Sequence, residues 1–141
     1  MTRDEIVSLL RRRQSAWDTH DAAGMAAVYT ETAVAISPTG GVLEGPDEIA
    51  RVNRTWFTAF PDVTWRSDDI IVDGDRVVEV AQFSGTHAGE FFGVPATGRR
   101  VDVQMVMVMT LVGGRIAEER RIYDFTGFLV QVGVLKAKPV A

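Results

Sequence analysis

The chain has 141 residues, of which 46% are hydrophobic and 24% are charged, with a formal net charge of −4 and no cysteine. This length allows a substantial core in one domain, predicted over residues 1–141. The composition excludes disulfides and thiolate chemistry, and the acidic balance gives no reason to expect nucleic acid as a partner. Two histidines without metal-ligand spacing argue against a protein-built zinc site.

The N-terminal segment predicts a helix that begins after Thr2, because Thr2 and Glu5 have the spacing of a capping box. Its apolar positions recur at helical intervals: Ile6, Leu9, Leu10, Ala16 and Trp17. The run Arg11-Arg12-Arg13 is spread around the helix axis and is expected to be solvated. The sequence shows no signal peptide or membrane-spanning run, which predicts a cytoplasmic protein without membrane contact.

Two more helices are predicted before the chain becomes β-rich. Asp21 is expected to cap a short second helix, and residues 32–37 read as a short strand. A third helix begins at Gly45-Pro46, since proline is favoured in the first helical turn, and it ends before Pro61.

The second half of the chain predicts strands joined by glycine-containing turns. The predicted segments are strands at 63–72 and 76–86, a glycine-rich irregular stretch at 85–98, strands at 101–112 and 115–123, and a short C-terminal tail. Helices followed by a run of strands indicate an α+β fold, with three N-terminal helices packed on a curved antiparallel sheet.

The turn Gly113-Gly114 sets an expectation for Asp124. A two-residue glycine loop pairs Val112 with Arg115, and the same register continued places Asp124 opposite Val103. That inner face would also carry Met105, Met107, Met109 and Ile122, and the outer face Gln104, Val106, Val108, Glu119, Arg121 and Tyr123. Burial of a lone carboxylate among apolar side chains would raise its pKa and suit it to acid–base chemistry near neutral pH.

Several motifs, in one order, resemble the SnoaL-like polyketide cyclases of the nuclear-transport-factor-2-like superfamily. The most specific segment, residues 85–99, reads GTHAGEFFGVPATGR and looks like the family's GTHxGxFxGxPxTGR block. Residues 113–118, GGRIAE, are similar to its DGKIxE turn, and the stretch from Asp124 to Gly133 is similar to its D…LLxQLG ending. The resemblance covers roughly residues 6–133.

This resemblance implies a cone-shaped fold with a deep pocket between helices and sheet, often in dimers or tetramers. It also implies ring closure by intramolecular aldol condensation without metal or organic cofactor. Asp124 matches the position of the family's acid/base, and His87 matches a histidine that lies nearby. Fold-mates include isomerases, epoxide hydrolases and non-catalytic binding domains, so the fold alone does not decide the function.

Each candidate catalytic residue has a structural alternative. Asp124 is either an acid/base in the pocket or an Asx cap that accepts from the amides of Thr126 or Gly127. His87 either donates to a substrate carbonyl or bonds the glycine-rich backbone around it. The remaining candidate pocket residues are Met105, Met107, Ile122, Trp17, Tyr29 and Trp56.

The sequence therefore predicts a cyclase or isomerase that acts on a small hydrophobic carbonyl compound. One alternative is a non-catalytic ligand-binding or dimerisation module of the same fold. Another, epoxide hydrolysis, would require further carboxylate and arginine partners in the pocket. Val106 and Val108 make the outer sheet face apolar, which predicts a homodimer or homotetramer formed through the sheet.

Overall fold

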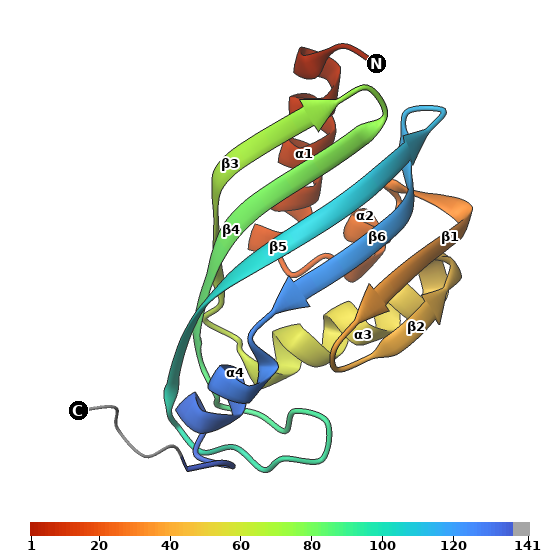
Figure 1. The fold of residues 1–141 in the computed structure, drawn as a ribbon. Coiled ribbons are helices and arrows are strands. Elements are labelled where there is room, and N and C mark those ends of the chain that lie inside the picture. Colours follow the sequence, from red (N-terminus) through yellow and green to blue (C-terminus); the bar gives the residue numbers. More distant parts are fainter. Residues whose placement is uncertain (137–141) are drawn as a thin grey trace.

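A six-stranded sheet curves over a layer of helices in the computed structural model, which describes residues 1–136 (Figure 1). The strand order is β2-β1-β6-β5-β4-β3. The strands are β1 (Tyr29–Ser37), β2 (Gly41–Glu44), β3 (Thr64–Asp73), β4 (Arg76–Thr86), β5 (Arg100–Val112) and β6 (Arg115–Tyr123). The predicted α+β class is confirmed. The sheet is mixed rather than purely antiparallel, because β1 pairs with β6 in the parallel direction.

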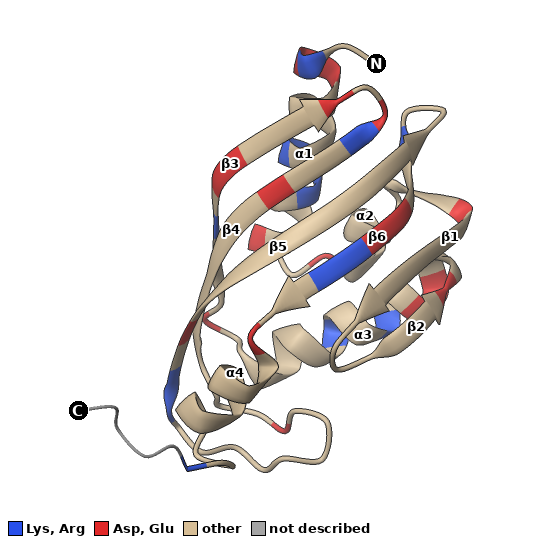
Figure 2. Ribbon diagram, viewed as in Figure 1, with Lys and Arg blue, Asp and Glu red and all other residues tan. Residues whose placement is uncertain are grey.

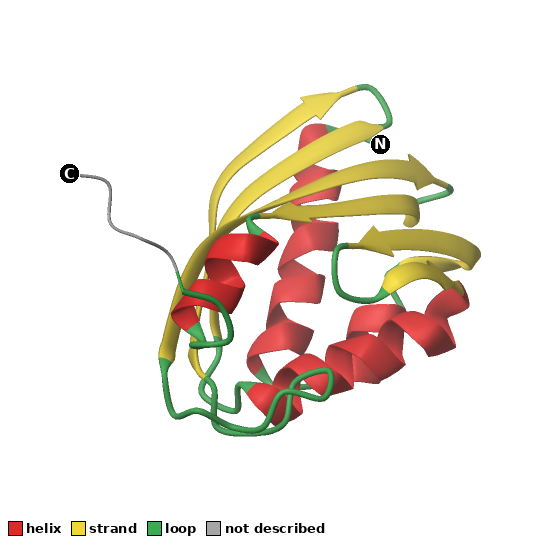
Figure 3. Cartoon of the chain, turned by 60° about the horizontal axis from the view of Figure 1, so that its bottom comes forward, coloured by secondary structure: helices red, strands yellow, loops and turns green. Residues whose placement is uncertain are grey.

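Three helices precede most of the sheet and cover its concave side, as Figure 3 shows. They are α1 (Arg3–Asp18), α2 (Ala22–Ala26) and α3 (Gly45–Ala59). The capping box predicted between Thr2 and Glu5 is present, and the side chain of Asp21 caps α2. The third helix carries a proline in its first turn, as predicted. The three predicted helices are thus present, but the second ends at Ala26, whereas it was expected to include Val28 and Tyr29; Tyr29 instead begins β1.

A fourth helix, α4 (Phe125–Gln131), follows β6 where the sequence predicted only a tail. Its N-cap is Asp124, and its Phe128 is fully buried in the core. A seven-residue helix gives little periodic signal, and most of its stabilisation comes from packing rather than from propensity. The remainder of the predicted tail, residues 137–141, lies outside the described residues.

The β5–β6 hairpin has the predicted turn but not the predicted register. Val112 pairs with Arg115 and Leu111 with Ile116, yet Thr110 pairs with Glu118. Ala117 is therefore an extra residue, a β-bulge, which shifts the rest of β6 by one position. Because side chains alternate along a strand, this shift exchanges the two faces of β6.

The exchange determines which chemical groups face the helices. Met105 pairs with Tyr123, and Met107 with Arg121. Glu119 and Arg121 are buried, whereas Ile122 is 52% exposed. The inner face of β6 thus carries charged residues in place of the predicted Ile122 and Asp124. Figure 2 shows the acidic and basic residues of β6 in the middle of the sheet; of these, Glu119 and Arg121 are the buried ones.

Candidate functional site

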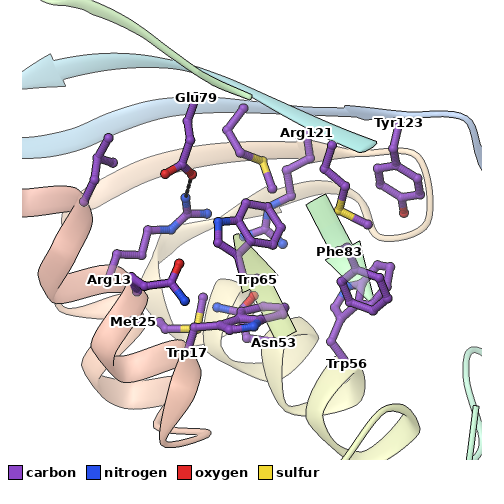
Figure 4. Close-up of a pocket in the computed structure, with 14 residues that line it drawn as sticks. Arg13, Trp17, Met25, Asn53, Trp56, Trp65, Glu79, Phe83, Arg121 and Tyr123 are labelled. Atoms are coloured by element: carbon purple, nitrogen blue, oxygen red, sulfur yellow. Dashed lines mark ion pairs between the residues drawn. The ribbon is translucent and has the colours of Figure 1, made fainter. Parts of the chain in front are cut away.

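A pocket lies between the concave face of the sheet and the first three helices (Figure 4). It is lined by Leu10, Arg13, Gln14, Trp17, Met25, Asn53, Trp56, Trp65, Glu79, Phe83, Met105, Met107, Arg121 and Tyr123. The cavity has a volume of about 30 Å³. A larger ligand must therefore displace side chains when it enters.

Aromatic and methionine side chains form the apolar wall of the pocket. Trp17 and Trp65 have ring centroids 5.4 Å apart, and Trp56 and Phe83 have theirs 5.2 Å apart. Methionine side chains are flexible and polarisable, so Met105 and Met107 can adapt to different ligand shapes. The wall suits a flat, apolar molecule.

Of the residues predicted for the pocket, Trp17, Trp56, Met105 and Met107 line it. Tyr29 does not line the pocket; it is 1% exposed, and its hydroxyl donates to Glu119 Oε2 at 2.5 Å.

The pocket also has a buried ionic cluster at the sheet. Arg13 Nη2 donates to Glu119 Oε1 at 2.5 Å, and Arg13 Nη1 lies 3.7 Å from Glu79 Oε1. Arg121 Nε donates to Glu119 Oε2 at 3.3 Å. These five side chains, Arg13, Tyr29, Glu79, Glu119 and Arg121, are called the ionic cluster below.

The two carboxyls of the ionic cluster have opposite environments. Burial raises the pKa of Glu79 above its ordinary value, although Arg13 opposes the shift. Burial would also raise the pKa of Glu119, but Arg13 and Arg121 hold that pKa below its ordinary value. Burial raises the pKa of Tyr29 to about 12. Glu79 is thus the carboxyl of the ionic cluster best suited to take up and release a proton.

Asp124 does not reach this pocket. It is exposed, and its Oδ1 accepts a hydrogen bond from the backbone N–H of Gly127 at 2.8 Å. This is the Asx-cap geometry that the sequence left open, and the predicted inward position is wrong because of the Ala117 bulge. Ile122 is displaced outward for the same reason.

His87 lies outside the pocket lining as well, although it is fully buried. Its Nδ1 lies 3.0 Å from Thr97 Oγ1, and its backbone pairs with Arg99 and Gly98. Its ring packs 5.6 Å from that of Phe60. The structure therefore places His87 in the loop between β4 and β5, where its ring contacts the Thr97 side chain and not the glycine-rich backbone; its role beside a substrate stays a prediction.

Sequence reasoning missed the ionic cluster, and one of its members left a readable signal. Arg13 was expected to be solvated but is 6% exposed, so that expectation is wrong. Its position continues the apolar stripe of Ile6, Leu9, Leu10 and Trp17 at helical spacing, which places it on the buried face. Glu79 lies likewise between Val77 and Ala81, both buried on β4. Glu119 and Arg121 gave no such signal, because the bulge is invisible in the residue pattern.

The described residues 1–136 hold no group of three histidine, cysteine, aspartate or glutamate side chains arranged for a metal ion. Among the same residues, no helix has both the length and the apolar character needed to cross a membrane.

Comparison with known proteins places this site in a family context. Residues 7–132 match a family model described as SnoaL-like polyketide cyclase. Nogalonic acid methyl ester cyclase of Streptomyces nogalater is 30% identical over 95 residues, which are 66% of this chain and 70% of that protein. The structure of TsrD from Streptomyces laurentii is 25% identical with a TM-score of 0.87, covering 96% of this chain and 99% of that one.

An NTF2-like protein from Burkholderia pseudomallei shares the fold at 19% identity and a TM-score of 0.78, over 94% of this chain and 99% of that one. The nuclear-transport-factor-2-like fold predicted from the sequence is thereby confirmed.

Proposed function

Since the chain belongs to the SnoaL-like polyketide cyclase family, we propose that it is an enzyme that cyclises or isomerises a hydrophobic carbonyl compound by acid–base catalysis without a cofactor. The observation that carries this proposal is the position of Glu79. It is a buried carboxyl with a raised pKa at the wall of an apolar pocket. Such a carboxyl suits proton transfer near neutral pH.

The proposed reaction is an intramolecular aldol addition. The Glu79 carboxylate removes a proton from the carbon next to a substrate carbonyl, and the electron pair moves onto the carbonyl oxygen as an enolate. The enolate carbon then attacks a second carbonyl of the same molecule, which forms the ring bond and an alkoxide. The alkoxide takes the proton back from Glu79, so that product and substrate have the same mass. An isomerisation would return the proton to a different carbon.

Glu119 is a poorer candidate for this proton transfer. It receives hydrogen bonds from Arg13, Arg121 and Tyr29, which stabilise its ionised form and engage both of its oxygens. Glu79 is held by Arg13 alone among these residues, at the longer distance of 3.7 Å. We therefore assign proton transfer to Glu79 and the fixing of Arg13 and Arg121 to Glu119.

The direct test follows α-proton exchange in D₂O by NMR and turnover by chromatographic separation of the isomeric product, with nogalonic acid methyl ester as the first substrate because a relative is named for it. We expect Glu79→Gln to reduce the rate about 10²- to 10⁴-fold and to stay folded. Asp124→Asn, which keeps an N-cap oxygen, is the matched control and should retain activity. Loss of activity in Asp124→Asn but not in Glu79→Gln would refute the assignment. Ligand binding without exchange in the wild type would favour the non-catalytic binding module.

A second candidate reaction, epoxide hydrolysis, is favoured by one observation. Arg13 lies between Glu79 and Glu119, which supplies the carboxylate and arginine partners that water activation would require. Turnover in ¹⁸O-labelled water separates the two reactions. Epoxide opening would place one water oxygen in the product, whereas aldol ring closure adds none at the new bond.

Assembly through the outer sheet face and a cytoplasmic location stay predictions. That face carries exposed Ile36, Ile71 and Ile122, with exposed fractions of 39%, 52% and 52%. Sedimentation of the wild type beside Ile122→Lys would test assembly, because a buried lysine in the interface should dissociate the oligomer.

A further inference from the structure

The pocket contains an unusual number of buried N–H donors without an acceptor. Within residues 1–136, six buried side-chain atoms lack a hydrogen-bond partner, and four of these belong to residues that line the pocket. The four are Arg13 Nε, Trp17 Nε1, Asn53 Nδ2 and Arg121 Nη2. All four atoms are nitrogens that donate, and none is an acceptor.

Such a concentration needs a physical reason. A buried donor left without a partner destabilises the folded protein, and native structures contain few of them. Arg13, Trp17, Asn53 and Arg121 are each at most 8% exposed, so bulk water does not satisfy them. A molecule that brings acceptor oxygens into the pocket would satisfy several of these donors together.

The charges around the pocket favour an acceptor that is negative. Arg13 comes from α1, Glu79 from β4, and Glu119 and Arg121 from β6, with the phenols of Tyr29 and Tyr123 beside them. Glu119 neutralises one guanidinium. Once Glu79 holds a proton, as it does after removing the α-proton in the proposed reaction, the second guanidinium is left without a counter-charge, and the ionic cluster has one positive charge in excess.

Arg121 and Asn53 are the best placed of these donors. Arg121 uses Nε for Glu119 and keeps Nη2 free. Asn53 lines the pocket from α3, and the close-up in Figure 4 shows it on the helix side, with Arg121 extending from the sheet. A ligand held between sheet and helix can meet both.

We propose that Arg121 and Asn53, assisted by the indole N–H of Trp17, form a binding site for an anionic oxygen of the ligand. The ligand class is a flat apolar molecule that bears a carboxylate or an ionised phenol or enol. Its apolar body packs against Trp56, Trp65 and Phe83, and its oxygen accepts from the guanidinium and the amide. This inference names the substrate class of the site in the proposed function and rests on it.

The test compares a charged probe with its neutral isostere, 2-naphthoate with 2-naphthamide, by isothermal titration and tryptophan fluorescence at pH 7. We expect the wild type to bind the carboxylate about tenfold more tightly or better, since hydrogen bonds to charged groups are the stronger ones. The ionisable phenol 4-nitro-1-naphthol distinguishes the two oxygen sources, because its absorption reports whether it binds as the phenolate.

Two variants test which residues cause the preference for the carboxylate probe. Arg121→Met should abolish the preference for the carboxylate. Asn53→Leu touches no ion pair and removes an unsatisfied donor, so it should weaken carboxylate binding while leaving the melting temperature unchanged or raised. Asn53→Leu keeps the test decisive if Arg121→Met does not fold.

The binding test of the anion site can fail or succeed independently of the turnover assay for the proposed reaction. Glu79→Gln should lose turnover but keep the preference for 2-naphthoate. Equal affinity for the two probes in the wild type, failure of both to bind, or unchanged carboxylate binding in Asn53→Leu would overturn the anion site, whatever the result of the turnover assay.

Discussion

Arg13 of α1 and Glu119 of β6 are 106 positions apart in the chain, yet their side chains form a buried ion pair at 2.5 Å. The pair joins the first helix to the centre of the sheet. Glu119 also accepts from Tyr29 and Arg121, so one carboxylate holds three neighbours in place. The charged wall of the pocket is therefore also a fixed contact between the two layers.

Glu119→Ala should be strongly destabilising, because it leaves the guanidinium groups of Arg13 and Arg121 buried without their counter-ion. Breaking a buried pair in this way costs about 3–5 kcal/mol, which urea denaturation would measure. Asp68→Asn, which breaks the exposed pair with Arg66, is the control and should leave the free energy of unfolding nearly unchanged. A similar small effect in both variants would contradict the structural role of Glu119.

Glu79 should make the stability depend on pH in a direction opposite to that of most carboxyls. Its pKa is raised in the folded protein, so the native state holds the proton more tightly than the unfolded chain does. Stability is therefore lost as the pH rises from the ordinary carboxyl pKa through the raised value. Relative to wild type, Glu79→Gln should gain melting temperature as the pH increases over this window. The exposed variant Glu90→Gln should show no such trend, and a flat difference for Glu79→Gln would argue against a raised pKa.

Asp124→Ala should destabilise the protein through α4 while leaving the pocket chemistry intact. Loss of an N-cap side chain costs about 0.5–2 kcal/mol, and Asp124→Asn should recover most of it. Chemical denaturation measures the stability, and the proton-exchange assay measures the chemistry. Loss of exchange in a fully stable Asp124→Ala protein would instead return this residue to the reaction.

Gly89→Ala should loosen the contact between the β4–β5 loop and α3. A Cβ at this position would lie 2.2 Å from the backbone oxygen of Thr58, so the backbone must move. Such overpacking costs on the order of 1–3 kcal/mol, visible as a lower melting temperature. Gly40→Ala meets only ordinary contacts of 3.4 Å or more and is the matched control. Equal melting temperatures would show that the loop accommodates the methyl group.

The sequence predicted what local chemistry controls. The capping box at Thr2, the proline at the start of α3, the glycine turn at residues 113–114 and the inner methionine row are all encoded within a few residues. The parallel pairing of β1 with β6 was not predictable in this way, because the two strands are far apart in the chain. The same holds for the ionic cluster, which forms only when α1, β4 and β6 come together.

The Asp124 prediction failed for a narrower reason. Its starting pair, Val112 with Arg115, is correct, and the methionine face is correct as well. The predicted register is wrong from Ala117 onward, because an alanine gives no sign in the sequence of a β-bulge. This one unpaired residue places Asp124 on the outside of the molecule instead of in the pocket.

The bulge at Ala117 also bears on how a hairpin of this kind can acquire new chemistry. If β6 paired with β5 without the bulge, so that Ala117 faced Thr110, then Glu118, Arg120, Ile122 and Asp124 would turn inward, and Glu119, Arg121 and Tyr123 would turn to the outside. A three-nucleotide deletion that removes Glu118 but keeps the bulge would likewise turn Arg120, Ile122 and Asp124 inward in one event. Point substitutions would need several successive changes to reach the same result, so insertions and deletions next to this turn are an efficient route by which such pockets diverge.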